Sequence, residues 1–113
     1  MNTTDAIWPA DLELAREFSR RLAKHSPPER FRVTLYGSRA RGEADAQSDL
    51  DLFVALEDDD SRGNLKEAAR QIACDLTLET GLLVSVFVAD SAFLRQHAGY
   101  SFLEVIAEEG VPV

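Results

Sequence analysis

Apolar and polar residues alternate along parts of the chain with the period of two that is typical of strands. Phe31, Val33 and Leu35 are separated by polar or basic residues. Residues 82–88 alternate in the same way, and an apolar stretch over 49–54 opens with two aspartates. The pattern therefore predicts strands in these parts of the chain.

Helical spacing of apolar residues marks the segments around these strands. In residues 10–24, large apolar residues recur every four positions, and residues 65–80 carry a similar apolar stripe. Shorter helices are expected over 91–97 and 102–109, and the tail that follows could pack on the sheet or on a partner. Two side chains are placed to cap the second and the last of these helices, namely Asn64 and Ser101.

The length of 113 residues suits a single domain, with an N-terminal helix and lead-in over 1–30 and a core over 31–113. No apolar run is long enough to cross a membrane, and the N-terminus lacks the basic and apolar segments of a secretory signal. The single cysteine, Cys74, excludes an internal disulfide and fits a reducing compartment. We therefore expect a cytoplasmic protein.

The net charge of −8 disfavours duplex nucleic acid as a partner, because its phosphates would be repelled. The charge is uneven, since eight of the twelve Lys and Arg residues lie within 16–41 and residues 57–60 are all acidic. This distribution suits a small anionic ligand or a basic protein partner, in a homo- or hetero-oligomer. The alternative for each charge is a solvated surface, and we expect 57–60 to be a solvated loop.

A glycine, a serine and two arginines follow the first strand. Gly37 lets a phosphate approach the backbone closely, because no Cβ stands in the way. Ser38 supplies a hydroxyl and is expected to cap a short helix over 39–42, whose free N–H groups attract anions. Arg39 and Arg41 add guanidinium groups that suit phosphate oxygens. These residues are predicted to bind the phosphates of a nucleotide.

Asp49 and Asp51 open the second strand, and their spacing places both side chains on one face. Paired carboxylates suit Mg²⁺, which completes its shell with water and substrate phosphates. A glycine-serine turn or an aspartate pair alone is usually an ordinary surface feature. Together, with ten residues between Ser38 and Asp49, they predict a site for Mg²⁺ and a nucleoside triphosphate.

Residues 35–42 (LYGSRARG) and 48–52 (SDLDL) resemble the signature of the DNA polymerase β-like nucleotidyltransferases, in particular the minimal nucleotidyltransferases of prokaryotes. The resemblance covers most of the chain from Phe31 onward. It implies an α+β fold with a small mixed sheet of about three strands flanked by helices. The residues that it assigns to catalysis and metal binding are Asp49 and Asp51, and those that it assigns to the nucleotide are Gly37, Ser38, Arg39, Arg41 and Ser48.

Minimal nucleotidyltransferases are often paired with a HEPN-domain protein as antitoxin and toxin. The resemblance therefore implies that this chain transfers AMP from ATP to a HEPN toxin, with Mg²⁺, and acts as its antitoxin. An alternative is a catalytically weak or inactive antitoxin that neutralises its partner by forming a complex. A further alternative is a small-molecule nucleotidyltransferase, although such enzymes usually carry an additional domain for the acceptor.

The choice among these functions depends on the strand over 82–88. Members of the superfamily usually carry a third carboxylate there, which helps to hold the catalytic metal and to accept a proton. In this chain the matching position is Ser85, and serine is a poor metal ligand and no general base near neutral pH. Asp90 lies past the strand end and could replace that carboxylate only if the chain curls back.

Overall fold

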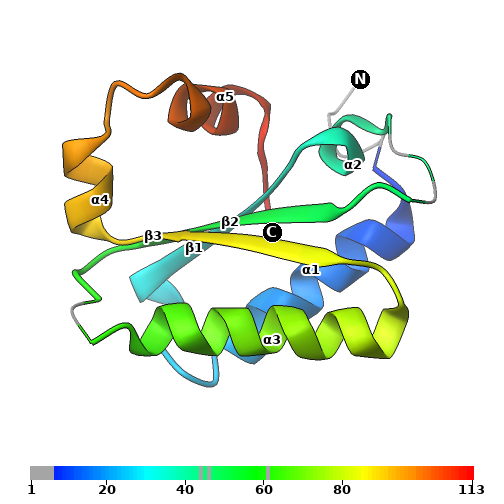
Figure 1. Ribbon diagram of the computed structural model, residues 1–113, viewed down its shortest axis with the longest axis horizontal. Coiled ribbons are helices and arrows are strands. Elements are labelled where there is room, and N and C mark those ends of the chain that lie inside the picture. Colours follow the sequence, from blue (N-terminus) through cyan, green and yellow to red (C-terminus); the bar gives the residue numbers. More distant parts are fainter. Residues whose placement is uncertain (1–6, 44, 46, 61) are drawn as a thin grey trace.

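The described part of the chain forms one mixed sheet with helices on both of its faces. The computed structural model describes residues 7–43, 45, 47–60 and 62–113 (Figure 1). The fold is α+β, as predicted. In chain order the elements are α1 (Pro9–Leu22), the 3-10 helix η2 (Pro28–Arg30), β1 (Phe31–Tyr36), α2 (Ser38–Arg41), β2 (Leu50–Leu56), α3 (Asn64–Thr80), β3 (Val84–Ala89), α4 (Ser91–Gln96), α5 (Ser101–Glu109) and β4 (Val111–Pro112).

The strands are arranged in the order β3-β2-β1-β4. β2 runs antiparallel to β1 and parallel to β3, and β4 pairs antiparallel with β1. The short strand β4 adds to the three that were expected, because the C-terminal tail pairs with the middle of β1. The register places Asp51 between Tyr36 of β1 and Ser85 of β3.

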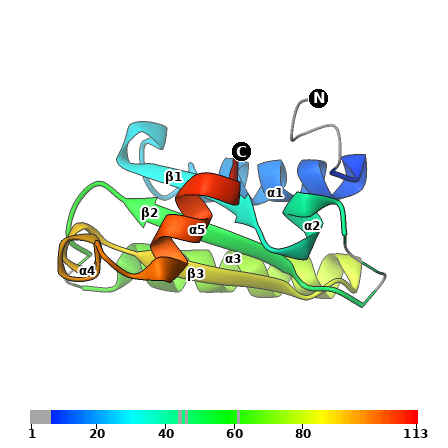
Figure 2. The same ribbon diagram turned by 90° about the horizontal axis from the view of Figure 1, so that it is seen from above.

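The main hydrophobic core lies between one face of the sheet and helices α1 and α3 (Figures 1 and 2). Phe18 and Leu22 of α1 are fully buried, as are Leu35 of β1 and Leu52 of β2. Removing each such side chain from water contributes about 1.5–3 kcal/mol to folding. Among the described helices, none combines the length and apolar character that a membrane crossing requires.

The opposite face of the sheet is only partly covered, by α4 and α5 (Figure 1). Phe53, Ala89 and Ile106 are buried in a smaller cluster there, and Phe87 and Phe93 pack against it. This cluster lies toward the end of β2 and β3, whereas Asp51 lies near the start of β2. The uncovered part of this face is therefore where the acidic residues project.

The side chains that cap the helices are not those expected from the sequence. The predicted caps Asn64 and Ser101 are wrong, since each is the first residue of its helix and makes no capping hydrogen bond. Asp60 instead accepts hydrogen bonds from the N–H groups of Leu65 and Lys66 at the start of α3. The acidic run is therefore partly structural rather than merely a solvated loop.

Asp90 is the N-cap of α4 and joins this helix to the acidic loop. Its carboxylate accepts hydrogen bonds from Phe93 N–H at 2.9 Å and from Asp60 N–H at 3.2 Å. These hydrogen bonds lower the pKa of Asp90 from its ordinary value. The ionised form is therefore favoured by folding, and the stability that it supplies is lost as the pH falls through the lowered pKa.

Replacing Asp90 with Ala should lower the free energy of unfolding near neutral pH by about 1 kcal/mol, because two N–H groups lose their acceptor. The difference between variant and wild type should begin to shrink near the usual carboxyl pKa of 3.8, where the unfolded chain takes up a proton, and should be smallest below the lowered pKa, where the folded protein is protonated as well. Urea unfolding at neutral and acidic pH measures both effects. Glu108→Ala, at an exposed carboxylate, is the control, and an equal loss at both pH values would contradict the charge-dependent cap.

Candidate active site

Gly37 brings the turn after β1 into contact with Asp51 of β2. The φ angle of Gly37 is 80°, a left-handed conformation that favours glycine. A Cβ atom at this position would lie 2.5 Å from Asp51 Oδ2. A larger residue would therefore have to displace the carboxylate, and the turn and the acidic strand meet at this contact.

Asp49 and Asp51 form a pair of carboxylates at the start of β2. Leu50 lies between them and is fully buried in the main core. Because side chains alternate along an extended chain, both aspartates point away from that core. Burial raises the pKa of Asp51, and the negative charge of Asp49 raises it further. The carboxylates are thus close enough to repel one another, and a bound cation would relieve this repulsion.

This pair fits a Mg²⁺ ion whose coordination shell is shared with a substrate. Within the described ranges, no three His, Cys, Asp or Glu side chains gather to hold a metal. Mg²⁺ needs only one or two protein carboxylates when phosphates and water supply the remaining oxygens. Asp49 and Asp51 could therefore hold the ion together with a nucleotide, which the turn at Gly37 would place beside them.

Ser85 lies beside Asp51 in the parallel pairing of β2 and β3, on the face that also carries Phe87. Its side chain is exposed, so this position of the site ends in a hydroxyl rather than a carboxylate. Asp90 does not replace it, because it follows the last residue of β3, five positions beyond Ser85 and about 17 Å away at strand spacing. The carboxylate of Asp90 is also engaged as the cap of α4.

Arg39 does not face the predicted phosphate site, so the prediction that it contacts a nucleotide is wrong. Its side chain is buried, with only 3% exposed, and donates two hydrogen bonds to the buried carboxylate of Asp11. The remaining nitrogens donate to the carbonyls of Ser48 and Asp45. The guanidinium group also lies over the ring of Trp8, 5.5 Å from its centroid. Arg39 therefore fixes the loop that leads to Asp49.

The other residues predicted to contact phosphate differ in whether their side chains are already bonded within the protein. Ser38 is the first residue of α2 and Gly37 is its N-cap, so the expected capping role of Ser38 is wrong. The Ser48 hydroxyl is bonded to Asp45 and its carbonyl to Arg39, which makes Ser48 part of the loop. Arg41 is exposed and pairs with Glu43, an arrangement that solvent weakens.

Two features of the site had not been predicted. Asp11 occupies the apolar stripe of α1, four positions before Ala15, and a carboxylate at such a position signals a buried basic partner. Tyr36 forms an aromatic wall beside Asp51, with its ring centroid 5.7 Å from that of Phe102. Burial raises the pKa of Tyr36, and the charge of Asp51 raises it further. The phenol is thus kept neutral next to the carboxylates.

Comparison with protein families gives one match, to the family described as a nucleotidyltransferase domain, over residues 15–106. The match spans the turn at Gly37, both aspartates and Ser85. A search among curated proteins finds no match to the chain.

Breaking the buried pair of Arg39 and Asp11 should strongly destabilise the protein. Arg39→Met should lower the free energy of unfolding by about 3–5 kcal/mol, because Asp11 is left as an unpaired buried charge. Arg41→Met, on the same short helix but exposed, should change it by less than about 0.5 kcal/mol. Urea unfolding compares the two variants.

A double variant, Asp11→Leu with Arg39→Met, should recover part of this loss because no buried charge remains unpaired. An Arg39→Met protein as stable as wild type, with weakened binding of ATP, would instead restore Arg39 to the nucleotide site.

Proposed function

Because the chain belongs to the nucleotidyltransferase domain family, we propose that it transfers AMP from ATP, with Mg²⁺, to a HEPN-domain toxin and acts as the antitoxin. Family membership supports nucleotidyl transfer as the general activity. The contact between Gly37 and Asp51 carries the assignment of the site, because it joins the phosphate-binding turn to the acidic pair. The choice of ATP and of the HEPN acceptor rests on the resemblance of residues 35–52 to minimal nucleotidyltransferases.

The reaction would break the bond between the α-phosphorus of ATP and the oxygen that joins it to the β-phosphorus. A hydroxyl oxygen of the acceptor forms the new bond to that phosphorus, pyrophosphate leaves, and the hydroxyl proton passes to solvent or to a base of the acceptor. Bound Mg²⁺ would neutralise charge on the phosphate oxygens. Gly37 would allow the phosphates to approach the backbone, and Asp49 and Asp51 would hold the ion against them.

Ser85 supports a second candidate function, that of an antitoxin that acts by complex formation with little catalysis. The hydroxyl lies beside Asp51, where a further carboxylate would complete the metal site, and it cannot act as a general base at neutral pH. In this case Asp49 and Asp51 would bind a nucleotide, or would serve only to shape the surface that the toxin meets.

The first function is tested by transfer of label from α-³²P-ATP to any HEPN-domain protein whose gene adjoins the gene of this protein. With Mg²⁺ present, the wild-type protein should label its partner, and Asp49→Asn and Asp51→Asn should each reduce the rate by about 100-fold or more, as expected for loss of a charge-stabilising group. Asp58→Asn, at an exposed aspartate after β2, is the matched control and should leave the rate unchanged.

An unlabelled partner, together with full neutralisation of the toxin by both Asn variants, would overturn the transferase assignment. That result would establish the second candidate, complex formation without chemistry.

Ser85→Asp should strengthen the metal site, because it places a carboxylate beside Asp51 on an exposed position of β3. We expect the Mg²⁺ concentration for half-maximal transfer to fall by about tenfold, on the scale of changes close to a metal. Ser85→Asn has the same shape without the charge and should not show this effect. Titration of the labelling rate with Mg²⁺ checks the comparison, and equal behaviour of the two variants would remove Ser85 from the site.

A further inference from the structure

β3 is an edge strand whose outer side carries free backbone groups. Leu50 N–H donates to Leu83 O, so the backbone of Leu83 faces β2 and that of the next residue, Val84, faces outward. Val84 N–H donates to Thr77 Oγ1 of α3, which agrees with this direction. By the same alternation, Val86 and Val88 direct their N–H and C=O groups to the outer edge. Within the described ranges, no strand pairs with that edge.

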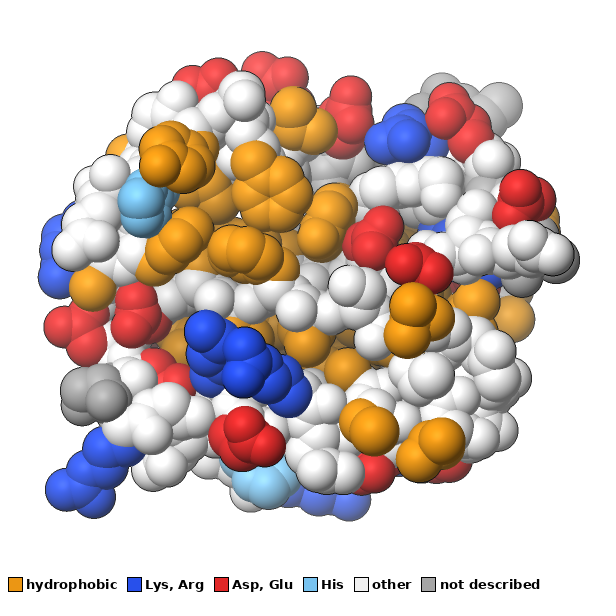
Figure 3. Space-filling view, in the orientation of Figure 1, with side chains coloured by type: hydrophobic (Ala, Val, Ile, Leu, Met, Phe, Trp, Pro, Cys, Tyr) orange, Lys and Arg blue, Asp and Glu red, His pale blue; other side chains and the backbone are white. Residues whose placement is uncertain are grey.

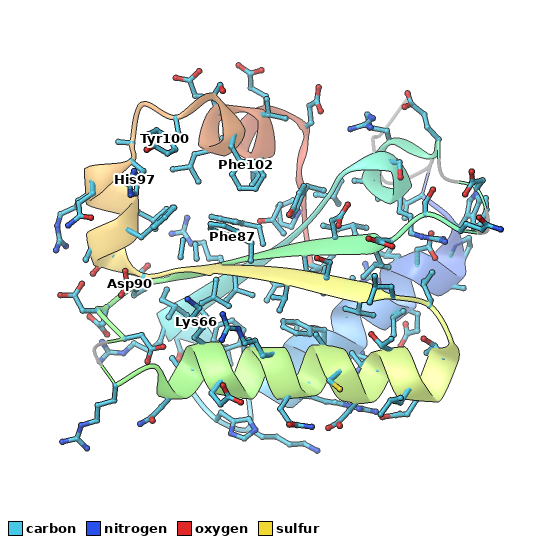
Figure 4. The ribbon with its side chains drawn as sticks, in the orientation of Figure 1. Lys66, Phe87, Asp90, His97, Tyr100 and Phe102 are labelled. Carbon is cyan, nitrogen blue, oxygen red and sulfur yellow. The ribbon has the colours of Figure 1, made fainter. Side chains whose placement is uncertain are left out.

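A groove runs between this edge and α3. Its central part has a volume of about 200 Å³, and its apolar end, toward the start of β3, has a volume of about 340 Å³. Figure 4 shows Lys66 between α3 and β3, and Figure 3 shows basic side chains beside the apolar band of this face. Residues lining the central part are Lys66, Arg70, Val86, Phe87, Val88 and Phe93.

The apolar end of the groove exposes two large side chains, Leu78 and Leu83, of which 80% and 53% are accessible. Isolated exposed leucines are common, but these two flank the open edge and lie on one groove with Cys74 and Val84. The edge thus offers hydrogen-bonding groups and apolar contact area together, which are the two requirements for adding a strand.

The basic residues of the groove point to the charge of its occupant. Only four Lys and Arg residues follow Arg41 in this acidic chain, and three of them recur every four positions. Lys66 and Arg70 line the groove, and Arg62 lines a hollow that continues it beyond Lys66 toward Asp60 and Asp90. None of these three forms an ion pair within the described part of the chain. The acids at the groove's end, Asp60 and Asp90, are engaged as helix caps.

We propose that β3 accepts an extended, acidic segment of a partner protein as an additional strand. The backbone of the segment bonds to Val86 and Val88, and its carboxylates meet Lys66 and Arg70. An edge strand presents alternating donors and acceptors, which match a polypeptide better than phosphate groups that only accept. A second copy of this chain is disfavoured as the occupant, because edge-to-edge pairing would bring two basic rows together.

A short capped peptide in which Val and Glu alternate, labelled with fluorescein, serves as the probe. Fluorescence anisotropy should show binding that weakens with salt, and the peptide with Lys in place of Glu should not bind. Replacing a central Val of the peptide with Pro should also prevent binding, because a backbone donor is lost. In the complex, the amides of Val86 and Val88 should exchange with deuterium more slowly than in the free protein.

Charge-reversed variants test whether the peptide binds at the groove or at another part of the surface. Lys66→Glu with Arg70→Glu should weaken binding by at least about tenfold, whereas Arg16→Glu with Lys24→Glu, the same charge change on exposed residues of the N-terminal region, should change it by less than about twofold. Asp51→Asn should bind normally, since the proposed strand addition does not depend on nucleotidyl transfer.

Four outcomes would overturn the proposal. Equal binding by the two charge-reversed proteins would show that the groove is not the site. Unchanged exchange at Val86 and Val88 would exclude strand addition. Displacement of the peptide by oligo(dT), without protection of either amide, would favour single-stranded nucleic acid as the occupant. A dimer detected by sedimentation and held together at β3 would favour a second copy of this chain.

Discussion

The register of β2 between β1 and β3 is the constraint on which the site depends. It pairs Asp51 with Tyr36 on one side and with Ser85 on the other. A slip of one residue would turn Asp51 into the core and bring an apolar neighbour to the open face. Leu50 and Leu52, both fully buried, oppose such a slip because they would have to enter water. The hydrophobic core thus determines where the carboxylates project.

A second constraint fixes the loop that precedes β2. Arg39 ties α1, through Asp11, to the carbonyl of Ser48, one residue before the acidic pair. Burying a charged pair stabilises a protein little when compared with apolar packing, but it specifies one geometry because an unpaired partner is costly. Arg39 therefore acts on the candidate site indirectly, by holding the loop that presents Asp49.

The sheet offers two distinct open regions. One is the uncovered face at Asp51, where carboxylates and a glycine turn suit a phosphorylated ligand and its cation. The other is the outer edge of β3, where backbone groups and Lys66 suit an acidic polypeptide. The two are separated by the alternation of the strand, since Ser85 faces the first and the backbone of Val86 faces the second. One strand can thus serve chemistry and association without sharing groups.

The sequence by itself determined the α+β fold and the three longer strands, and it singled out Gly37 and the aspartate pair as candidate ligands of a phosphate and a cation. These follow from local rules, because periodicity and spacing are set by residues close together in the chain. Tertiary structure alone decided the role of Arg39, and it added to the local cap that Asp90 makes with Phe93 N–H a link to the acidic loop. An arginine near a glycine turn and an aspartate after a strand look the same locally whether they bind a ligand or fix the fold. The partners that decide this, Asp11 for Arg39 and the N–H of Asp60 for Asp90, lie far away in sequence and meet them only when the chain packs.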